Sequence, residues 1–476
     1  MSDLREIPAA KGEAAPPISR AVWAAAVVMA LGSFLANMDS SIVAVGLESM
    51  RVSLHTGLSA IQWVATAFLL GLSAALPLTP WLIRRTGAGR LWMVTFALFL
   101  LTSAGCALAP AIGVLVGVRG VQGMAAGVLL AAGQTVIGLA VGPERLGRMM
   151  GTLGMVVGLA PVVGPSVGGF LLSRFSWPAL FWLNLPIGLP VLLLALRFVP
   201  RGQRQRPPRM DWPGLALVSV SLPALVYALT ELGSPGGASV VPYLIIAAAG
   251  LGSLALFGWR SLRARDPVLR LRLAANPVLA ASLLTVLLAG ASMFGAVLLL
   301  PLWFQLRLGL GSTSTGLFLI ALGLGSTLIM LVAGRLTDAH GGGVVSLAGS
   351  LVVLLSTIAW PWFGPHTPMA LIQVLLIVRG AGLGLAMMPA TTAAYAAVRP
   401  ADLGDATALT NIAMRVGGAV GGALCVIVLS RGLTVSVPTG FHSAFIVLAG
   451  ICLLATIASG WLRNAEKHRT PRKGTT

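Results

Sequence analysis

The chain is dominated by apolar runs of about twenty residues that are separated by short polar segments. An α-helix of this length spans the hydrocarbon core of a bilayer, so each run predicts one membrane-spanning helix. We identify fourteen runs, at residues 22–47, 59–78, 91–108, 112–141, 149–172, 178–198, 212–232, 243–259, 278–304, 315–336, 344–363, 369–398, 406–429 and 441–462. The pattern predicts an all-α polytopic membrane protein.

Composition supports this prediction, because 57% of the 476 residues are hydrophobic and only 9% are charged. A soluble globular protein of this size has a much larger charged fraction. The first run is longer than the core of a signal peptide and ends without a small-residue cleavage site, so we interpret it as a retained span.

The net charge of +19 follows the predicted topology. If the N-terminus is cytoplasmic, most basic residues fall in cytoplasmic loops and tails, as the positive-inside rule requires. The opposite side then holds only Arg51, Arg174, Arg307 and Arg431. We therefore predict a multi-pass protein of the cell membrane with both termini in the cytoplasm. Anionic lipids are the expected partners of the basic loops, and nucleic acid is not.

An internal repeat divides the chain into two halves. Arg119-Gly120 in the first half corresponds to Arg379-Gly380 in the second, and Pro143-Glu144 corresponds to the segment that begins at Pro400. Two six-helix halves related by a repeat are a common transporter design. We predict a tail at 1–20, a six-helix bundle at 21–198, basic connectors with two additional helices at 199–272, a second six-helix bundle at 273–464 and a tail at 465–476.

Cysteine and histidine do not indicate a metal or catalytic site. Cys106, Cys425 and Cys452 lie inside apolar runs, no CxxC motif occurs and the five histidines are scattered. We therefore predict no disulfide framework, no metal and no cofactor. A membrane enzyme would need an acidic metal motif or a His–acid pair, and the one candidate cluster is Asp402 with Asp405. We predict that the protein is not an enzyme.

Asp39 is the one acidic residue inside an apolar run rather than at its end. A carboxylate near the middle of a membrane costs roughly 2.5–3.5 kcal/mol on insertion scales, so such a residue usually has a function. Binding a proton and binding a cationic substrate are the two obvious roles. The alternative is an Asp that only forms a hydrogen bond with a neighbouring helix.

The residues around Asp39 are similar to a known motif. Residues 37–47, NMDSSIVAVGL, resemble the first-helix motif L-D-x-T-I-V-N-V-A-L-P of the fourteen-helix drug:proton antiporter branch of the major facilitator superfamily. Arg119 and Gln122, in Leu115-x-x-x-Arg119-x-x-Gln122-Gly123, resemble the fourth-helix motif, whose Arg is associated with proton transfer. The resemblance covers about residues 20 to 464. It implies the major facilitator fold and proton coupling by Asp39 and Arg119.

A glycine-rich segment resembles the fifth-helix antiporter motif G-x8-G-x3-G-P-x2-G-G of the same branch, which is associated with export. The matching residues are Gly151, Gly164, Pro165, Gly168 and Gly169. Glycine lets helix backbones approach closely, and Pro165 is expected to bend the helix. Ordinary small-residue packing is the alternative explanation.

Two loops resemble the gating motif G-x-L-x-D-R-x-G of the superfamily. The second-half loop fits well, with Gly334, Asp338 and Gly341 in place. The first-half loop carries Arg84, Arg85 and Gly87, and Arg84 stands where the motif has Asp. That Asp normally helps to form a gating charge pair. Asp338, or Asp402 and Asp405, are the candidates to replace it.

Several other polar and aromatic residues in the runs are candidates for a substrate pocket, with helix packing as the alternative. They are Gln62, Trp63, Gln122, Gln134, Phe294, Trp303, Gln305, Asn411 and Arg415. Together, the residues and the resemblance predict a monomeric proton-coupled antiporter that exports small hydrophobic or cationic compounds by alternating access, as in drug or antibiotic efflux. The alternatives are an exporter of an endogenous metabolite or lipid and a non-transporting membrane sensor.

Overall fold

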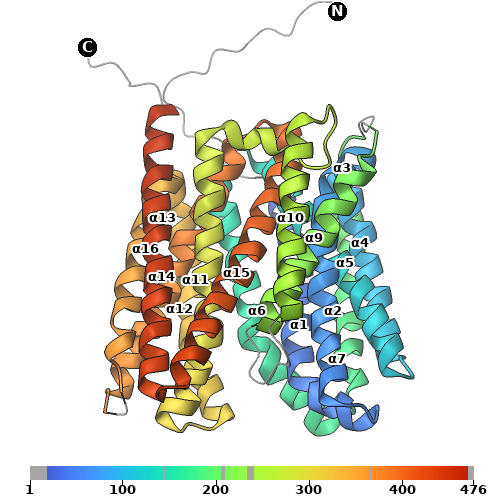
Figure 1. Cartoon of the computed structure of the whole chain (residues 1–476). Helices are drawn as coiled ribbons and strands as arrows, with labels where there is room; N and C mark the ends of the chain where they lie inside the picture. Colours follow the sequence, from blue (N-terminus) through green and yellow to red (C-terminus); the bar gives the residue numbers. More distant parts are fainter. Residues whose placement is uncertain (1–18, 143–144, 205–208, 233–240, 365, 470–476) are drawn as a thin grey trace, which may run out of the picture.

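The computed structural model describes residues 19–142, 145–204, 209–232, 241–364 and 366–469, and every regular element within these ranges is a helix. Most of the predicted N-terminal tail and residues 470–476 of the predicted C-terminal tail lie outside these ranges. The last helix continues to Arg469, five residues beyond the predicted end of the second bundle. The two ends of the described chain lie on the same face of the molecule, which we call the terminal side (Figure 1).

The first half of the chain forms one bundle. Its elements are α1 (Arg20–Ser53), α2 (Leu58–Ala75), η1 (Leu76–Leu78), α3 (Thr79–Thr86), α4 (Ala88–Ala107), α5 (Ile112–Val141), α6 (Leu146–Arg174), α7 (Pro178–Trp182) and α8 (Asn184–Phe198). Short breaks leave α2, η1 and α3 in one span and α7 and α8 in another.

Two helices and a connector lead to the second bundle. They are α9 (Trp212–Leu232), α10 (Val241–Arg263) and η3 (Leu271–Ala275). The second bundle contains α11 (Pro277–Leu308), α12 (Ser312–His340), α13 (Gly342–Ile358), η4 (Trp360–Trp362), α14 (Met369–Ala396), η5 (Pro400–Asp402), α15 (Leu403–Leu433) and α16 (Val437–Arg469).

The described residues include twelve helices that are long and apolar enough to cross a membrane. The bent helix α12 is a thirteenth candidate, with a 45° bend between Met330 and Val332. Helix α9 contains the apolar stretch Trp212–Leu225, which is shorter than these spans. The all-helical polytopic fold is therefore confirmed, and the count of fourteen spans stays a prediction.

The helix ends follow from local sequence. Ser19 caps α1 by accepting a hydrogen bond from the Val22 amide at 3.3 Å. Asn276 caps α11 in the same way at 3.0 Å, ahead of Pro277 at the first helical position. The missing amide of proline costs nothing there, because the first amides of a helix have no intrahelical partner. At the other end of α11, Gly309 adopts the left-handed conformation that terminates many helices.

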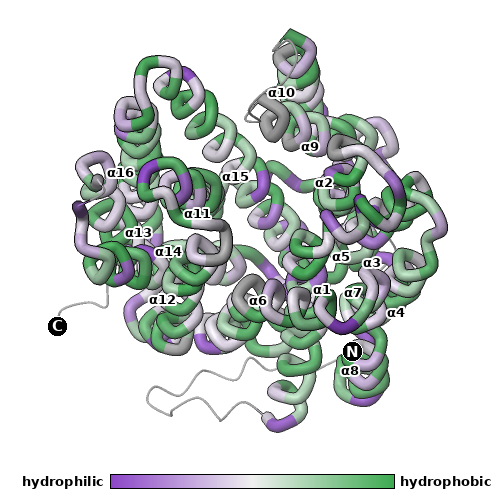
Figure 2. Tube along the Cα trace, turned by 90° about the horizontal axis from the view of Figure 1, so that it is seen from below, coloured by the Kyte–Doolittle hydropathy of each residue, from purple (hydrophilic) through white to green (hydrophobic). Residues whose placement is uncertain are grey.

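The surface of the molecule matches a lipid environment. Large apolar side chains face outward on both bundles, and Leu101 and Leu355 are 70% and 67% exposed. Figure 2 shows hydrophobic residues along most of the outward-facing helices. An exposed apolar surface of this kind is unfavourable in water, but lipid tails cover it in a membrane.

The two bundles meet along α6 and α12, where glycines let the backbones approach closely. A Cβ atom added at Gly151 would lie 2.6 Å from the Met330 carbonyl oxygen, and one added at Gly334 would lie 2.6 Å from that of Gly147. Any side chain there would push the helices apart, so glycine at these positions allows the contact.

Helix α9 contacts both bundles and lies at their junction. On the first bundle, the Ser219 hydroxyl donates to the Ala74 carbonyl oxygen at 2.9 Å, and Tyr227 stacks on Trp63 at 5.5 Å. On the second bundle, Val218 and Leu222 share an apolar cluster with Ala408 and Leu409 of α15. The Arg260 side chain on α10 donates to the carboxylate of Asp211, just before α9, at 2.7 Å. The additional helices thus cover one side of the boundary between the bundles.

Candidate functional site

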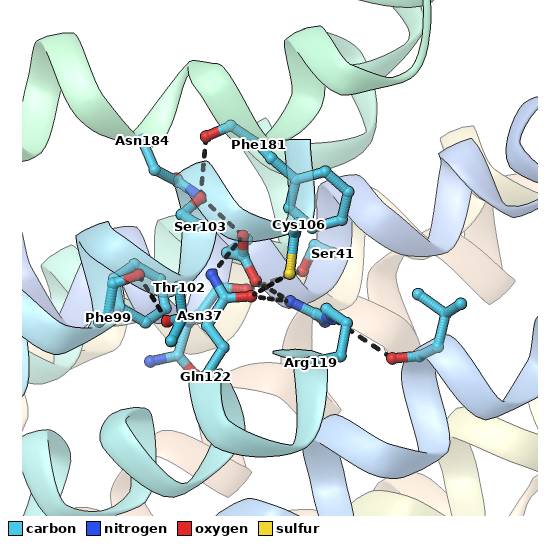
Figure 3. A network of polar contacts seen from close by, with 12 residues as sticks. Asn37, Ser41, Phe99, Thr102, Ser103, Cys106, Arg119, Gln122, Phe181 and Asn184 are labelled. Carbon is cyan, nitrogen blue, oxygen red and sulfur yellow. Dashed lines mark hydrogen bonds and ion pairs between the residues drawn. The ribbon is translucent and has the colours of Figure 1, made fainter. Parts of the chain in front are cut away.

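Asp39 lies at the centre of a buried polar cluster inside the first bundle. Its carboxylate accepts hydrogen bonds from Arg119 Nη1 at 2.6 Å, Asn184 Nδ2 at 2.7 Å and Gln122 Nε2 at 3.4 Å. The side chains of Asp39 and Arg119 are 0% and 1% exposed. Figure 3 shows side chains of α1, α4, α5 and α8, among them Arg119, Gln122 and Asn184, gathered in one polar network. A charge pair so far from water needs such partners, because the attraction must offset the loss of hydration.

The arrangement follows from the positions of these residues on their helices. Arg119 and Gln122 are three residues apart on α5, so they share one face, and Arg119 Nη1 also donates to Gln122 Oε1 at 2.8 Å. Arg119 Nε donates to the Val64 carbonyl oxygen at 3.3 Å, and its guanidinium lies 4.3 Å from the ring centre of Phe68. Arg119 is therefore held by hydrogen bonds, an ion pair and a cation–π contact at once.

Asn184, the first residue of α8, is a polar residue of the predicted run 178–198, and its contact with Asp39 was not predicted from the sequence. Its Nδ2 donates both to Asp39 and to the Ser103 hydroxyl at 2.9 Å, and its Oδ1 is buried without a hydrogen-bond partner in the described part of the chain. Its place as an amide side chain inside an otherwise apolar run was the available signal. Cys106 adds a weak hydrogen bond to Gln122 at 3.5 Å. The cluster can hold a proton, whereas no group of three metal-ligating side chains occurs among the described residues.

The pocket candidates predicted from the sequence do not form one site. Gln122 belongs to the Asp39 cluster, and Gln134 accepts from Asn411 Nδ2 at 2.7 Å across the boundary between α5 and α15. Trp303 is buried against Trp360 and Phe304 inside the second bundle. Gln62 and Gln305 lie on the exposed surface, and Trp63 stacks on α9. Phe294 packs where a Cβ atom of Gly418 would lie, and Arg415 is half-buried on α15.

Polar contacts close the terminal side between the bundles. Arg84 Nη1 donates to the Asp405 carboxylate at 2.8 Å, and the Arg84 and Asp405 side chains are only 8% and 0% exposed. The hydroxyls of Thr135 and Thr407 lie 2.9 Å apart on the same boundary. The carboxylate of Asp338 accepts from the backbone amides of Gly147 and Arg148 at 2.9 and 3.0 Å. An acid suits the amino end of α6, where the helix dipole is positive.

The structure thus separates the three acids that the sequence left as gating candidates. Asp405 pairs with Arg84, so the bundle contact contains an Arg–Asp pair although the first-half loop lacks its Asp. Asp402 instead binds Arg270 at 2.6 Å and Arg399 at 3.0 Å. Of the other loop residues, Arg85 is exposed beside Trp81, while Gly87 and Gly341 have φ angles of 87° and 84° that favour glycine.

The glycines of the fifth-helix motif serve two different contacts. Gly151 faces α12 of the second bundle, whereas Gly164 and Gly168 face Ser41 and Ile42 of α1 in their own bundle. A Cβ atom at Gly169 would meet nothing within 4 Å. Helix α6 is one unbroken helix, and the bend expected at Pro165 is not among the breaks of more than 40°. The pronounced break lies in α12, which is the partner of α6.

Comparison with known proteins identifies the family to which this chain belongs. The family model of the Major Facilitator Superfamily matches residues 29–422. The chain is 31% identical over 406 residues to a multidrug resistance protein B homolog of Mycobacterium tuberculosis, covering 85% of this chain and 75% of the relative. It is 25% identical to the lincomycin resistance protein LmrB of Listeria monocytogenes, over 92% of this chain and 96% of the relative.

Solved structures share the fold at low sequence identity. A double Trp mutant of XylE has a TM-score of 0.68 and 14% identity, and the match covers 94% of this chain and 99% of that chain. XylE bound to 6-bromo-6-deoxy-D-glucose has a TM-score of 0.65, also at 14% identity, with 93% of this chain and 95% of that chain covered. The chain belongs to the major facilitator superfamily, in the branch that contains its multidrug resistance relatives, and it is a membrane transporter rather than an enzyme.

Proposed function

We propose that this transporter is a proton-coupled antiporter that exports small, predominantly hydrophobic compounds from the cytoplasm by alternating access. The observation that carries the proposal is the fully buried Asp39–Arg119 pair at 2.6 Å in the middle of the first bundle. The names of the relatives, which refer to multidrug and lincomycin resistance, support efflux as the direction of transport.

Protonation of Asp39 would change the charge of the cluster by one unit. A proton that binds a carboxylate oxygen removes the negative charge, so Arg119 loses its ion pair and keeps Gln122 and the Val64 carbonyl oxygen as acceptors. The resulting O–H needs an acceptor, and Asn184 Oδ1 is a buried acceptor nearby that has no donor in the described part of the chain. A rotation of the Asn184 amide would present that oxygen to Asp39. The cluster therefore has a partner available for either protonation state.

The terminal-side contacts support the alternating-access part of the proposal. Arg84–Asp405, Thr135–Thr407 and Gln134–Asn411 all join the first bundle to α15. With the termini in the cytoplasm, these contacts would close the cytoplasmic entrance, and they would separate when the transporter opens inward. Transporters of this design bind substrate between two bundles that rock about a fixed site.

The surroundings of Asp39 favour proton binding over direct binding of a cationic drug. Arg119, Gln122 and Asn184 already occupy both carboxylate oxygens, and Asp39 is only 1% exposed. A bulky cation would have to displace Arg119 from its ion pair. A proton needs no such space, so a hydrophobic substrate bound elsewhere is the simpler arrangement.

We also propose that α9 is a fourteenth span and that both termini are cytoplasmic. Helix α9 has 21 residues, enough to cross a bilayer, and it packs beside α2 and α15 over the bundle boundary. The cluster of arginines on the terminal side, including Arg84, Arg85 and Arg90, supports the cytoplasmic assignment.

The test is transport by the purified full-length protein in proteoliposomes under an imposed pH gradient. Ethidium, lincomycin, dansylamide and dansylglycine serve as probes, so that cations, a neutral compound and an anion are all tested, and wild type is compared with Asp39→Asn. Glu48→Gln is the matched control, because Glu48 is an exposed acid on the same helix that pairs with Arg51. Gradient-driven movement that is lost in Asp39→Asn and kept in Glu48→Gln is expected. Equal gradient-driven transport by wild type and Asp39→Asn would contradict the proposal.

A further inference from the structure

The charges in the middle of the long helices do not balance. Among the described residues, four charged side chains lie seven residues or more from both ends of their helices: Asp39, Arg119, Arg379 and Arg415. Asp39 neutralises Arg119. Two arginines remain without an acidic partner in the described part of the chain, and a cation at membrane depth is costly unless a counter-charge is supplied.

Arg379 is the repeat mate of Arg119, but it is enclosed by neutral groups. It is 1% exposed, and its guanidinium donates to the Thr357 hydroxyl, to the Ser292 hydroxyl at 3.0 Å and to the Ser292 carbonyl oxygen at 3.1 Å. Its Nε has no hydrogen-bond partner in the described residues. Arg379 therefore contributes a fixed positive charge from inside the second bundle, without reaching the boundary between the bundles.

Arg415 lies on the face of α15 that meets the first bundle. A Cβ atom at Gly404 would lie 3.3 Å from Ile83 of α3, and Asn411 binds Gln134 of α5 at 2.7 Å. Residues 404, 411 and 415 are spaced by seven and four, so they share one helix face. Arg415 is one turn beyond Asn411, on the side away from the termini.

Along this stretch of α15, polar residues up to Asn411 have partners in the first bundle, and Arg415 is the first that has none in the described residues. Asp405 is paired with Arg84, Thr407 with Thr135 and Asn411 with Gln134. Arg415 is half-buried, and within the described ranges it has no ion pair and its buried Nε has no partner. Phe294 of α11 packs where a Cβ atom of Gly418 would lie, three residues further along α15. Arg415 is therefore a half-buried cation without a partner in the described residues, directly beyond the contacts that close the terminal side.

We propose that the transported compound carries an anionic group, such as a carboxylate, and that Arg415 binds this group while the apolar remainder lies between the bundles. The inference rests on the proposed transport function and specifies its substrate class. A guanidinium donates two parallel hydrogen bonds to a carboxylate, which a lysine ammonium cannot do in the same geometry. The uncompensated charge of Arg379 adds to the positive potential in the second bundle and disfavours cations.

The test uses three probes that share one fluorophore and differ in charge: dansylglycine is an anion, dansylamide is neutral and dansylcadaverine is a cation. Binding to the purified full-length protein in a neutral detergent is measured by energy transfer from the twelve tryptophans to the dansyl group, without a pH gradient. Wild type is expected to bind dansylglycine about 10- to 100-fold more tightly than dansylamide, the range for hydrogen bonds to a charged group.

Variants at position 415 show whether the preference for an anion depends on the positive charge of Arg415 or on the shape of its guanidinium group. Arg415→Gln is expected to reduce the anion-to-neutral ratio to about one, Arg415→Lys to keep part of it, and Arg415→Glu to reverse the preference toward dansylcadaverine. Arg431→Gln is the control, because Arg431 is an exposed arginine at the far end of the same helix. An unchanged ratio in Arg415→Gln, or a wild type that prefers the cation, would overturn the inference.

Stability without any probe gives a second readout. If Arg415 has no counter-charge in the protein, Arg415→Gln removes an unfavourable charge, and its thermal midpoint is expected to equal or exceed that of wild type. A marked loss of stability would show a structural partner for Arg415 and would contradict the inference. Gradient-driven transport without anion preference would overturn this inference alone, whereas anion preference without gradient dependence would overturn the proposed antiport alone.

Discussion

The Arg84–Asp405 pair gives a quantitative prediction about the closed terminal side. The pair is 2.8 Å long, and its two side chains are 8% and 0% exposed, so Asp405→Asn leaves a buried arginine without a counter-charge. Removing one partner of a buried pair costs about 3–5 kcal/mol. The asparagine still accepts a hydrogen bond, so we take about 3 kcal/mol as the cost to the closed arrangement. At about 1.4 kcal/mol per factor of ten, this shifts the closed-to-open ratio by about 100-fold.

The assay is the accessibility of a cysteine at position 407. Thr407 is buried between the bundles against Thr135, so a Thr407→Cys thiol is protected while the terminal side is closed. The three native cysteines are buried and are replaced by serine in this background. Maleimide labelling is expected to be about 100-fold faster with Asp405→Asn. Exchanging the charges, with Arg84→Asp and Asp405→Arg together, is expected to restore most of the protection.

Asp402→Asn is the matched control for this experiment. Asp402 is equally buried on the terminal side, but its partners are Arg270 and Arg399 rather than a residue of the first bundle. A labelling rate in Asp405→Asn within twofold of the parent, or an equal acceleration in Asp402→Asn, would show that the Arg84–Asp405 pair does not hold the terminal side closed.

Two further predictions test the packing and the topology. Gly334→Ala places a methyl group 2.6 Å from a backbone oxygen of α6, so it is expected to lower the free energy of unfolding by about 1–3 kcal/mol and to reduce transport. The methyl group of Gly169→Ala meets no atom within 4 Å, so this variant is expected to change the free energy of unfolding by less than about 0.5 kcal/mol. Equal thermal midpoints for the two variants would contradict this. A membrane-impermeant maleimide is expected to label His55→Cys in intact cells and Arg204→Cys only after permeabilisation, and the reverse pattern would overturn the assigned orientation.

Much of the fold could be predicted from the sequence, because membrane spans are set by length and apolarity alone. The predicted runs coincide with long helices nearly everywhere, including the interrupted segments that became α2–η1–α3 and α7–α8. The break in α12 was not predicted, because no proline occurs at Met330–Val332. The sequence pointed to Pro165 instead, and α6 remains one helix around it.

The part of the candidate site inside the apolar helices was predictable, because charged residues are rare there. Asp39 and Arg119 stand out because an apolar helix has few reasons to contain them, and they lie 2.6 Å apart. Pairs across the bundles were not predictable, because Arg84 and Asp405 are separated by 321 residues and by the whole boundary between the halves. Pocket residues were the least predictable, since a helix in lipid can be apolar on every side. Periodicity therefore could not distinguish the buried Trp303 from the exposed Gln305.

In the proposed mechanism, Asp39 couples substrate movement to proton movement. The most direct measurement is the reverse flux: an imposed substrate gradient should drive protons across proteoliposomes that contain a trapped pH-sensitive dye. Binding linkage is reciprocal, so a compound driven by protons must also drive them. For any probe that wild type transports under a pH gradient, we expect substrate-driven proton movement in wild type and Glu48→Gln and none in Asp39→Asn. Substrate transport by wild type with no accompanying proton movement, or proton movement that persists in Asp39→Asn, would contradict it.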